Sequence, residues 1–275
     1  MISKDMIAVV TGGAQGIGRS ICVALAARGV KVYSLDIKDT ENRETERLMQ
    51  SLQPHAWALH CDVSDADDVD TVFDSILKAE DGIDILVNNA AVFSTMSFVE
   101  TSYRDALRDW AFNMDTNARS TFLCTKKAAP SMAAHGHGEI INIVTNHVRR
   151  DLFPPSDSEH GYDASKYAQL SLTESMACEL SAYGIRVNAV CPASTRSPML
   201  TAFFDGIGME LNRETIGRVS GYATLLESEE VAETVCAMMN WDGREPVGKA
   251  YLLMYSEDCL ELQNGHSQRL SKQVK

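Results

Sequence analysis

The sequence predicts an α/β fold of the doubly wound type, in which a parallel sheet of about seven strands carries helices on both faces. Two observations lead to this prediction. Short apolar runs alternate with helical patterns over most of the chain, and such alternation implies parallel strands joined by right-handed crossovers. The length of 275 residues suits a single domain with a large core, and no repeat or linker divides the chain.

Each expected strand is a short apolar run that ends at polar or turn-forming residues. These runs cover residues 7–10, 30–36, 55–61, 83–87, 139–145, 185–191 and 250–255. The expected helices lie between them and repeat apolar residues at 3.6-residue spacing. They cover residues 17–29, 40–52, 65–80, 103–134, 162–183, 199–211 and 228–241. We place the domain at residues 1–260 and a polar C-terminal tail at residues 261–275.

The joint between the first strand and the first helix is rich in glycine. Residues 9–19 read Val-Val-Thr-Gly-Gly-Ala-Gln-Gly-Ile-Gly-Arg. Glycines at such a joint allow a tight turn and let a pyrophosphate approach backbone N–H groups, while the helix N-terminus supplies a partial positive charge. A turn without a ligand can also contain these glycines, so the loop alone is a weak indication of a nucleotide.

An acidic residue that ends the second strand strengthens the nucleotide prediction. Asp36 lies 18 residues after Gly18, and an acid at about this spacing accepts hydrogen bonds from the adenosine ribose hydroxyls and repels a 2′-phosphate. Neither Gln15 nor Ile37 offers a positive charge to such a phosphate. The sequence therefore predicts NAD, and not NADP, as the cofactor.

The composition limits the partners and the compartment. A net charge of −13 and a pI near 4.9 argue against nucleic acid and anionic membranes as partners. The seven cysteines are far apart and form no Cys-x-x-Cys motif, which is typical of free thiols in a reducing compartment and argues against a bound metal. No signal-peptide pattern or apolar run of membrane-spanning length occurs. We therefore expect a cytoplasmic protein whose partners are small molecules or further copies of the chain.

Tyr162 and Lys166 are four residues apart in an expected helix, so their side chains share one face. A free tyrosine has a pKa of about 10, but a nearby ammonium and a cationic nicotinamide would both favour the phenolate and lower that pKa. Tyr162 could then take the proton of an alcohol while the cofactor takes the hydride. A Tyr/Lys pair can also simply stabilise a helix surface, and the upstream nucleotide loop favours the catalytic interpretation.

These motifs resemble, in order and spacing, those of the short-chain dehydrogenase/reductase family, and the resemblance covers about residues 6–255. Two signatures carry it: the loop Thr11-Gly12-x-x-x-Gly16-x-Gly18 and the helix motif Tyr162-x-x-x-Lys166. The resemblance implies a doubly wound Rossmann fold, a nicotinamide cofactor and an alcohol or ketone substrate.

The resemblance also implies which residues hold the cofactor. Asp62-Val63 resembles an adenine-contacting pair, and Asn88-Asn89-Ala90-Ala91 resembles the family's Asn-Asn-Ala-Gly turn with Ala91 in place of glycine. Pro192 and Ser197 stand where the family often has Pro-Gly and a nicotinamide-contacting threonine. The implied cofactor-binding residues are Gly12, Gln15, Gly16, Ile17, Gly18, Asp36, Asp62, Val63, Asn89, Ala90, Tyr162, Lys166, Pro192 and Ser197.

Two further residues complete the implied catalytic set of Asn117, Thr145, Tyr162 and Lys166. Asn117 matches an asparagine that holds a water on a proton relay to the lysine, although a buried amide bonded to backbone would look the same. Thr145 stands where the family has a substrate-orienting serine, and it lies 17 residues before Tyr162, about four more than usual. Threonine keeps the hydroxyl donor, while its methyl group stiffens χ1.

The extra residues enlarge the loop at 147–160, and long loops beside a site often bind substrate. Arg149 and Arg150 could hold an anionic substrate or could be solvated surface. Met199, Phe203 and Phe204 could close the pocket from the other side or could pack in the core or at an oligomer interface.

We expect an NAD-dependent oxidoreductase that interconverts a secondary alcohol and a ketone, with Tyr162 as general acid/base. The alternatives are a catalytically silent NAD-binding member of the family and, less favoured, an epimerase or dehydratase. The family implies a homotetramer or homodimer, but the chain lacks the Asp-Gly-Gly turn that usually follows the last strand.

Overall fold

The structure is a computed structural model that describes residues 5–149, 158–221, 223–239, 247–255, 258–263 and 266–270. Its central sheet contains the seven parallel strands that the sequence predicts, in the order β3-β2-β1-β4-β5-β6-β7. The strands are β1 (Ile7–Thr11), β2 (Lys31–Asp36), β3 (Ala56–His60), β4 (Ile85–Asn88), β5 (Gly138–Ile143), β6 (Ile185–Pro192) and β7 (Ala250–Tyr255). The doubly wound fold is therefore confirmed.

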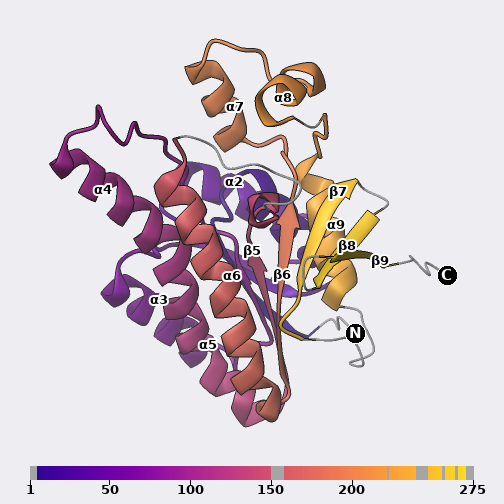
Figure 1. The fold of residues 1–275 in the computed structure, drawn as a ribbon. Helices are drawn as coiled ribbons and strands as arrows, with labels where there is room; N and C mark the ends of the chain where they lie inside the picture. The colour runs from indigo at the N-terminus through magenta and orange to yellow at the C-terminus, as the bar shows by residue number, and fades with distance from the viewer. Residues whose placement is uncertain are drawn as a thin grey trace.

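Helices cover both faces of the sheet (Figure 1). One face packs on α1 (Gly16–Ala26), α2 (Asp39–Gln50) and α9 (Ser228–Met239). The other packs on α3 (Ala66–Ala79), α5 (Ser120–His135) and α6 (His160–Leu180). In β1, Val9 faces one helical layer and Val10 faces the other. Because this strand is buried on both faces, its sequence is a continuous apolar run rather than an alternation of apolar and polar residues.

Three further helices lie outside these two layers. α4 (Tyr103–Asn113) packs against α6, while α7 (Pro198–Gly206) and α8 (Arg213–Ser220) project beyond the carboxyl ends of the strands (Figure 1). The sequence predicts one helix over 103–134, but a π-helical turn, η1 (Met114–Arg119), separates α4 from α5. Short 3-10 turns follow β5 at η2 (Asn146–Val148) and α6 at η3 (Ser181–Tyr183). Within the described residues, no helix is long and apolar enough to cross a membrane.

The C-terminal segment differs from the sequence prediction. Two antiparallel strands, β8 (Asp258–Gln263) and β9 (His266–Leu270), extend the sheet beyond β7. The predicted domain boundary at residue 260 falls inside β8. The expected polar tail at 261–275 therefore contains the end of β8 and all of β9. Residues 264, 265 and 271–275 lie outside the described part. The sequence analysis interpreted this polar segment as a tail and did not consider the Asn264-Gly265 dipeptide, which is a typical sequence signal of a two-residue hairpin connection.

The cysteines that the structure describes agree with the prediction that they form no disulfides. Cys22, Cys61, Cys124, Cys191 and Cys236 are buried thiols, whereas Cys178 is exposed. Burial raises the pKa of the Cys22 and Cys61 thiols to about 12, so these two thiols are protonated and unreactive at neutral pH.

Candidate active site

The glycine loop lies at the carboxyl edge of the sheet, where close packing requires residues without side chains. A Cβ atom at Gly12 would lie 2.7 Å from the Cα atom of Ala90, and one at Gly18 would lie 2.0 Å from the Gly12 carbonyl oxygen. Gly12 also has a φ of 67°, a conformation that favours glycine. The Asn89 amide donates to the Thr11 and Gly12 carbonyls at 3.0 Å each, which connects the loop to the end of β4.

Asp36 ends β2 beside this loop. Its carboxylate accepts hydrogen bonds from the backbone N–H groups of Ala14 and Lys38, both at 3.0 Å. The Lys38 ammonium donates to the Gln15 side chain at 3.2 Å. The loop therefore has a cation beside it that the sequence analysis missed, because Lys38 is two positions beyond the strand end.

The expected adenine-contacting pair follows β3. The Asp62 carboxylate accepts from the backbone N–H and the hydroxyl of Ser64, at 2.9 and 2.7 Å, and Val63 is buried. These bonds hold the turn after β3 at the same edge of the sheet as the glycine loop.

Tyr162 and Lys166 lie on α6, with the Lys166 Nζ atom 5.8 Å from the centre of the Tyr162 ring. Lys166 is only 2 % exposed, and its ammonium donates to the Ile143 carbonyl at 2.9 Å and to the Gln169 side chain at 3.0 Å. Burial lowers the pKa of Lys166 to about 7, since a buried ammonium loses its hydration.

Asn117 lies in the π-helical turn, a feature often found at functional sites. Its amide pairs with the backbone of Val92, accepting from the N–H at 2.8 Å and donating to the carbonyl at 2.9 Å. It also donates to the Ser165 hydroxyl at 2.9 Å. The side chain therefore holds α6 and the segment after β4 together, and its part in a water relay to Lys166 stays a prediction.

Two residues that the sequence analysis missed connect Lys166 to Asn117. Gln169 accepts from Lys166 and donates to the Thr121 hydroxyl at 2.9 Å, and Thr121 in turn donates to the Asn117 carbonyl at 3.1 Å. Gln169 is buried. A polar residue on the buried face of α6, three positions after Lys166, was the available signal, because buried amides find partners.

Thr145 lies directly after β5 and is buried. Its hydroxyl accepts from the backbone N–H of His147 at 3.4 Å and lies 3.3 Å from the Asn146 side-chain oxygen. Thr145 and Tyr162 line one cavity of about 760 Å³. Ile17, Pro192 and Ser197, three of the residues implied in cofactor binding, line the same cavity.

A histidine and two carboxylates at this cavity form a charged group that the sequence analysis did not predict, and His147 and Glu159 are among the lining residues. The His147 Nδ1 atom lies 3.1 Å from Asp163 Oδ1 and 3.2 Å from Glu159 Oε2, and the ring meets Tyr162 edge-on. Burial alone would lower the pKa of His147, but the hydrogen bonds and charges of Asp163 and Glu159 outweigh burial and raise that pKa to about 9. The ring is therefore a cation at neutral pH.

The remaining wall of the cavity is mainly apolar. Phe93 packs edge-on against both Tyr162 and Phe203. The apolar lining includes Phe93, Met199, Leu200, Phe203, Phe204 and Val219. Met199, Phe203 and Phe204, which were expected either to close the pocket or to pack elsewhere, all line the cavity. Phe204 also packs in a small buried cluster with Ile216 of α8.

The enlarged loop is described only in part. Arg149 is 7 % exposed, so the interpretation of this residue as solvated surface is wrong, and it is not among the described residues that line the cavity. Arg150 lies outside the described residues, as do positions 151–157 of the loop.

A comparison with known families decides the classification. The family described as short chain dehydrogenase matches residues 6–215. The chain belongs to this family. Its members are oxidoreductases that use a nicotinamide cofactor, so the short-chain dehydrogenase resemblance inferred from the motifs is confirmed.

Individual relatives agree with this assignment. The farnesol dehydrogenase of Aedes aegypti is 34% identical over 89% of this chain and 97% of its own length. The fluoren-9-ol dehydrogenase of a Terrabacter strain is 31% identical over 76% of this chain, but the match spans only 60% of that protein. A variant of actinorhodin polyketide ketoreductase, solved with NADPH, has the same fold, with a TM-score of 0.79 at 24% identity over 92% of this chain and 97% of that one.

Proposed function

We propose that this short-chain dehydrogenase uses NAD(H) to interconvert a secondary alcohol and a ketone, with Tyr162 as the general acid/base. One observation carries the proposal: Tyr162 and Thr145 line the same cavity as Ile17, Pro192 and Ser197. A substrate oxygen in this cavity can therefore reach a proton-transfer group and a hydroxyl donor beside the site implied for the nicotinamide.

The residues at the edge of the sheet fit a dinucleotide. The absence of side chains at Gly12 and Gly18 lets the loop fold tightly against Ala90 and its own backbone, and the N-terminus of α1, which follows this loop, favours a pyrophosphate. Asp36 lies beside this loop and Asp62 follows β3, where they can bind the ribose and the adenine end. When bound, the nicotinamide supplies the hydride acceptor or donor.

The side chains divide the proton chemistry among them. Tyr162 takes the hydroxyl proton when an alcohol is oxidised and returns it when a ketone is reduced. Thr145 donates a hydrogen bond to the substrate oxygen and stabilises the charge that develops there. The Lys166 ammonium favours the phenolate form of Tyr162 and binds the nicotinamide ribose, while Gln169 and Asn117 hold the lysine and its helix in position.

The cofactor preference rests on Asp36. Its carboxylate beside the loop repels a 2′-phosphate, which supports NAD. The Lys38 ammonium, which reaches Gln15 on the same loop, is the cation toward which an NADP phosphate could turn. We therefore expect Asp36→Ala to weaken the preference for NAD and Lys38→Ala to strengthen it.

The apolar lining indicates a bulky, largely apolar substrate. Phe93, Met199, Leu200 and Phe203 line the cavity that Tyr162 also lines, and Phe93 contacts the Tyr162 ring. A cavity of about 760 Å³ admits a molecule of several rings or a long chain. The names of two relatives, which refer to fluoren-9-ol and farnesol, agree with this class.

We also propose that the protein is a homo-oligomer, a tetramer or a dimer. Several large apolar side chains are exposed along α4 and near it. They include Phe98, Tyr103, Leu107, Trp110 and Phe112. Contact with a second copy of the chain would remove them from water, and exposed apolar patches often mark such interfaces.

The decisive experiment has two parts. NAD and NADP are titrated by fluorescence against the wild type, Asp36→Ala and Lys38→Ala, and equal affinities for both cofactors in the wild type would contradict the assignment to NAD. A panel of apolar and anionic alcohols and ketones is then scanned for change at the nicotinamide absorbance band. Tight NAD binding with no turnover across the panel would favour the catalytically silent alternative.

A further inference from the structure

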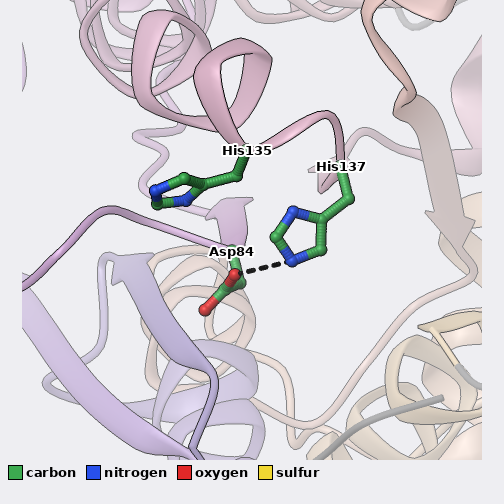
Figure 2. A group of neighbouring side chains, drawn as sticks. All are labelled: Asp84, His135 and His137. Atoms are coloured by element: carbon green, nitrogen blue, oxygen red, sulfur yellow. Dashed lines mark ion pairs between the residues drawn. The ribbon is translucent and has the colours of Figure 1, made fainter.

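A second cluster of polar side chains lies at the amino ends of the parallel strands, opposite to the cavity. Asp84 directly precedes β4, His137 directly precedes β5, and His135 is the last residue of α5. The three side chains converge, with the two imidazole rings on either side of the carboxylate (Figure 2). The chemistry proposed for the cavity uses none of them.

The separations suit shared coordination of one ion. His137 Nε2 lies 3.2 Å from Asp84 Oδ1, and one ligand atom from each of the three side chains lies within 4.8 Å of the other two. Zinc binds imidazole nitrogen and carboxylate oxygen at about 2.0–2.2 Å, so two ligands of a tetrahedral zinc ion are about 3.3 Å apart. Asp84 and His137 already have this spacing, and the ligand atom of His135 lies within 4.8 Å of both.

The surrounding backbone positions these groups. The other carboxylate oxygen of Asp84 accepts from the backbone N–H of Ile7 at 2.8 Å, which leaves Oδ1 directed toward His137. Metal-binding carboxylates are commonly oriented by such a second hydrogen bond. A Cβ atom at Gly82 would lie 2.6 Å from the His135 ring, so the ring rests against the backbone there. Gly136, with a φ of 71°, ends α5 between the two histidines.

The donor set selects the class of ion. Two imidazoles and one carboxylate suit zinc and its neighbours in the first transition series, whereas magnesium and calcium prefer oxygen ligands only. Both histidines are exposed and Asp84 is half-buried, so an ion can enter from solvent and complete its coordination with water.

We propose that Asp84, His135 and His137 form a binding site for a divalent transition-metal ion such as Zn²⁺. The ion joins the start of β4 to the turn between α5 and β5, and it therefore acts on stability at the end of the sheet remote from the cavity. The sequence analysis predicted no metal because it considered cysteine spacing, and Asp84 is distant in sequence from both histidines.

The test is a calorimetric titration of Zn²⁺ into full-length protein that has been freed of metal by a chelator. The proposal predicts one site that His135→Gln and His137→Gln each weaken by about tenfold or more. Zn²⁺ should also raise the melting temperature of the wild type, and both variants should lose this shift while melting near the wild type without metal.

Two control variants locate the ion. His55→Gln changes another exposed histidine and should leave Zn²⁺ affinity unchanged. His147→Gln changes the second group that could hold a metal, His147 with Glu159 and Asp163, and should likewise have no effect. The proposal would be overturned by any of three results. These are Zn²⁺ binding that both His135→Gln and His137→Gln leave undiminished, loss of Zn²⁺ binding in His147→Gln, and no Zn²⁺ binding by the wild type.

Discussion

Replacing Lys166 by methionine should change how the stability of the protein depends on pH. Burial lowers the pKa of Lys166 from 10.5 to about 7. Between these values the unfolded chain binds a proton that the folded protein does not, so this group makes the free energy of unfolding rise with pH. His147 has the opposite effect, since Asp163 and Glu159 overcome burial and raise its pKa from 6.5 to about 9. Its contribution to stability is therefore lost as pH rises toward 9.

The two effects nearly cancel between pH 7 and pH 8. One proton per pH unit corresponds to about 1.36 kcal/mol. With the two shifted values, Lys166 adds and His147 removes free energy of unfolding on the order of 1 kcal/mol each over this pH unit. These two groups should therefore largely offset each other in the wild type, whereas Lys166→Met should lose stability on the order of 1 kcal/mol relative to the wild type over the same pH unit. Buried thiols such as Cys22 affect stability mainly above this range, because a thiol in the unfolded chain has a pKa of 9.0.

Urea unfolding of the cofactor-free protein at several pH values between 7 and 8 measures this difference. The slope of free energy against urea should stay constant across pH, so that the comparison is of stability alone. Lys126→Met, which changes an exposed lysine of α5, is the matched control and should follow the wild type. Parallel curves for Lys166→Met and the wild type would show that Lys166 keeps its proton throughout, and the reasoning from burial would be wrong.

Three other predictions concern the site and the surface. Thr145→Ser keeps the hydroxyl and should retain activity within about tenfold, whereas Thr145→Val removes it and should lose about 10²–10³ in turnover. Melting temperatures should be recorded for both variants, because valine cannot accept the hydrogen bond from the His147 N–H group. Gln169→Leu removes the acceptor of a hydrogen bond from the Lys166 ammonium, and such a charged hydrogen bond contributes about 1.5–3 kcal/mol. The pKa of Lys166 should therefore fall by about 1–2, and the pH profile of kcat/KM should shift with it. An unchanged profile would show that Gln169 does not act through Lys166. Trp110→Asp should lower the mass measured by light scattering if α4 forms the subunit interface, and an unchanged oligomer would place the interface elsewhere.

The sequence alone predicts the parallel sheet because local signals and tertiary structure agree. Inner strands such as β1 and β4 are buried on both faces, so they appear as continuous apolar runs. Gly12 and Gly18 occupy positions where a side chain would collide with backbone. Parallel strands share their carboxyl edge, which is why residues as far apart as Thr145 and Ser197 could be expected at one cavity and are found there.

Other features could not be read from local patterns. The π-helical turn at Met114–Arg119 is a short segment that reads Met-Asp-Thr-Asn-Ala-Arg, and it holds too few apolar residues for periodicity to reveal it. The links between Lys166, Gln169 and Thr121 depend on the packing of α6 against α5, and the approach of His135 to Asp84 depends on the order of strands in the sheet. The burial of Arg149 likewise follows from tertiary contacts that residue type alone opposes.

The central claim is that Tyr162 transfers the proton, and Tyr162→Phe tests it most directly. The change removes only the hydroxyl, and Tyr183→Phe, at an exposed tyrosine, is the matched control. On a substrate found in the panel, with NAD bound, turnover of Tyr162→Phe should fall by about 10²–10⁴ while NAD affinity and melting temperature stay near the wild type. Retention of most of the wild-type turnover by a folded, NAD-bound Tyr162→Phe protein would contradict the mechanism.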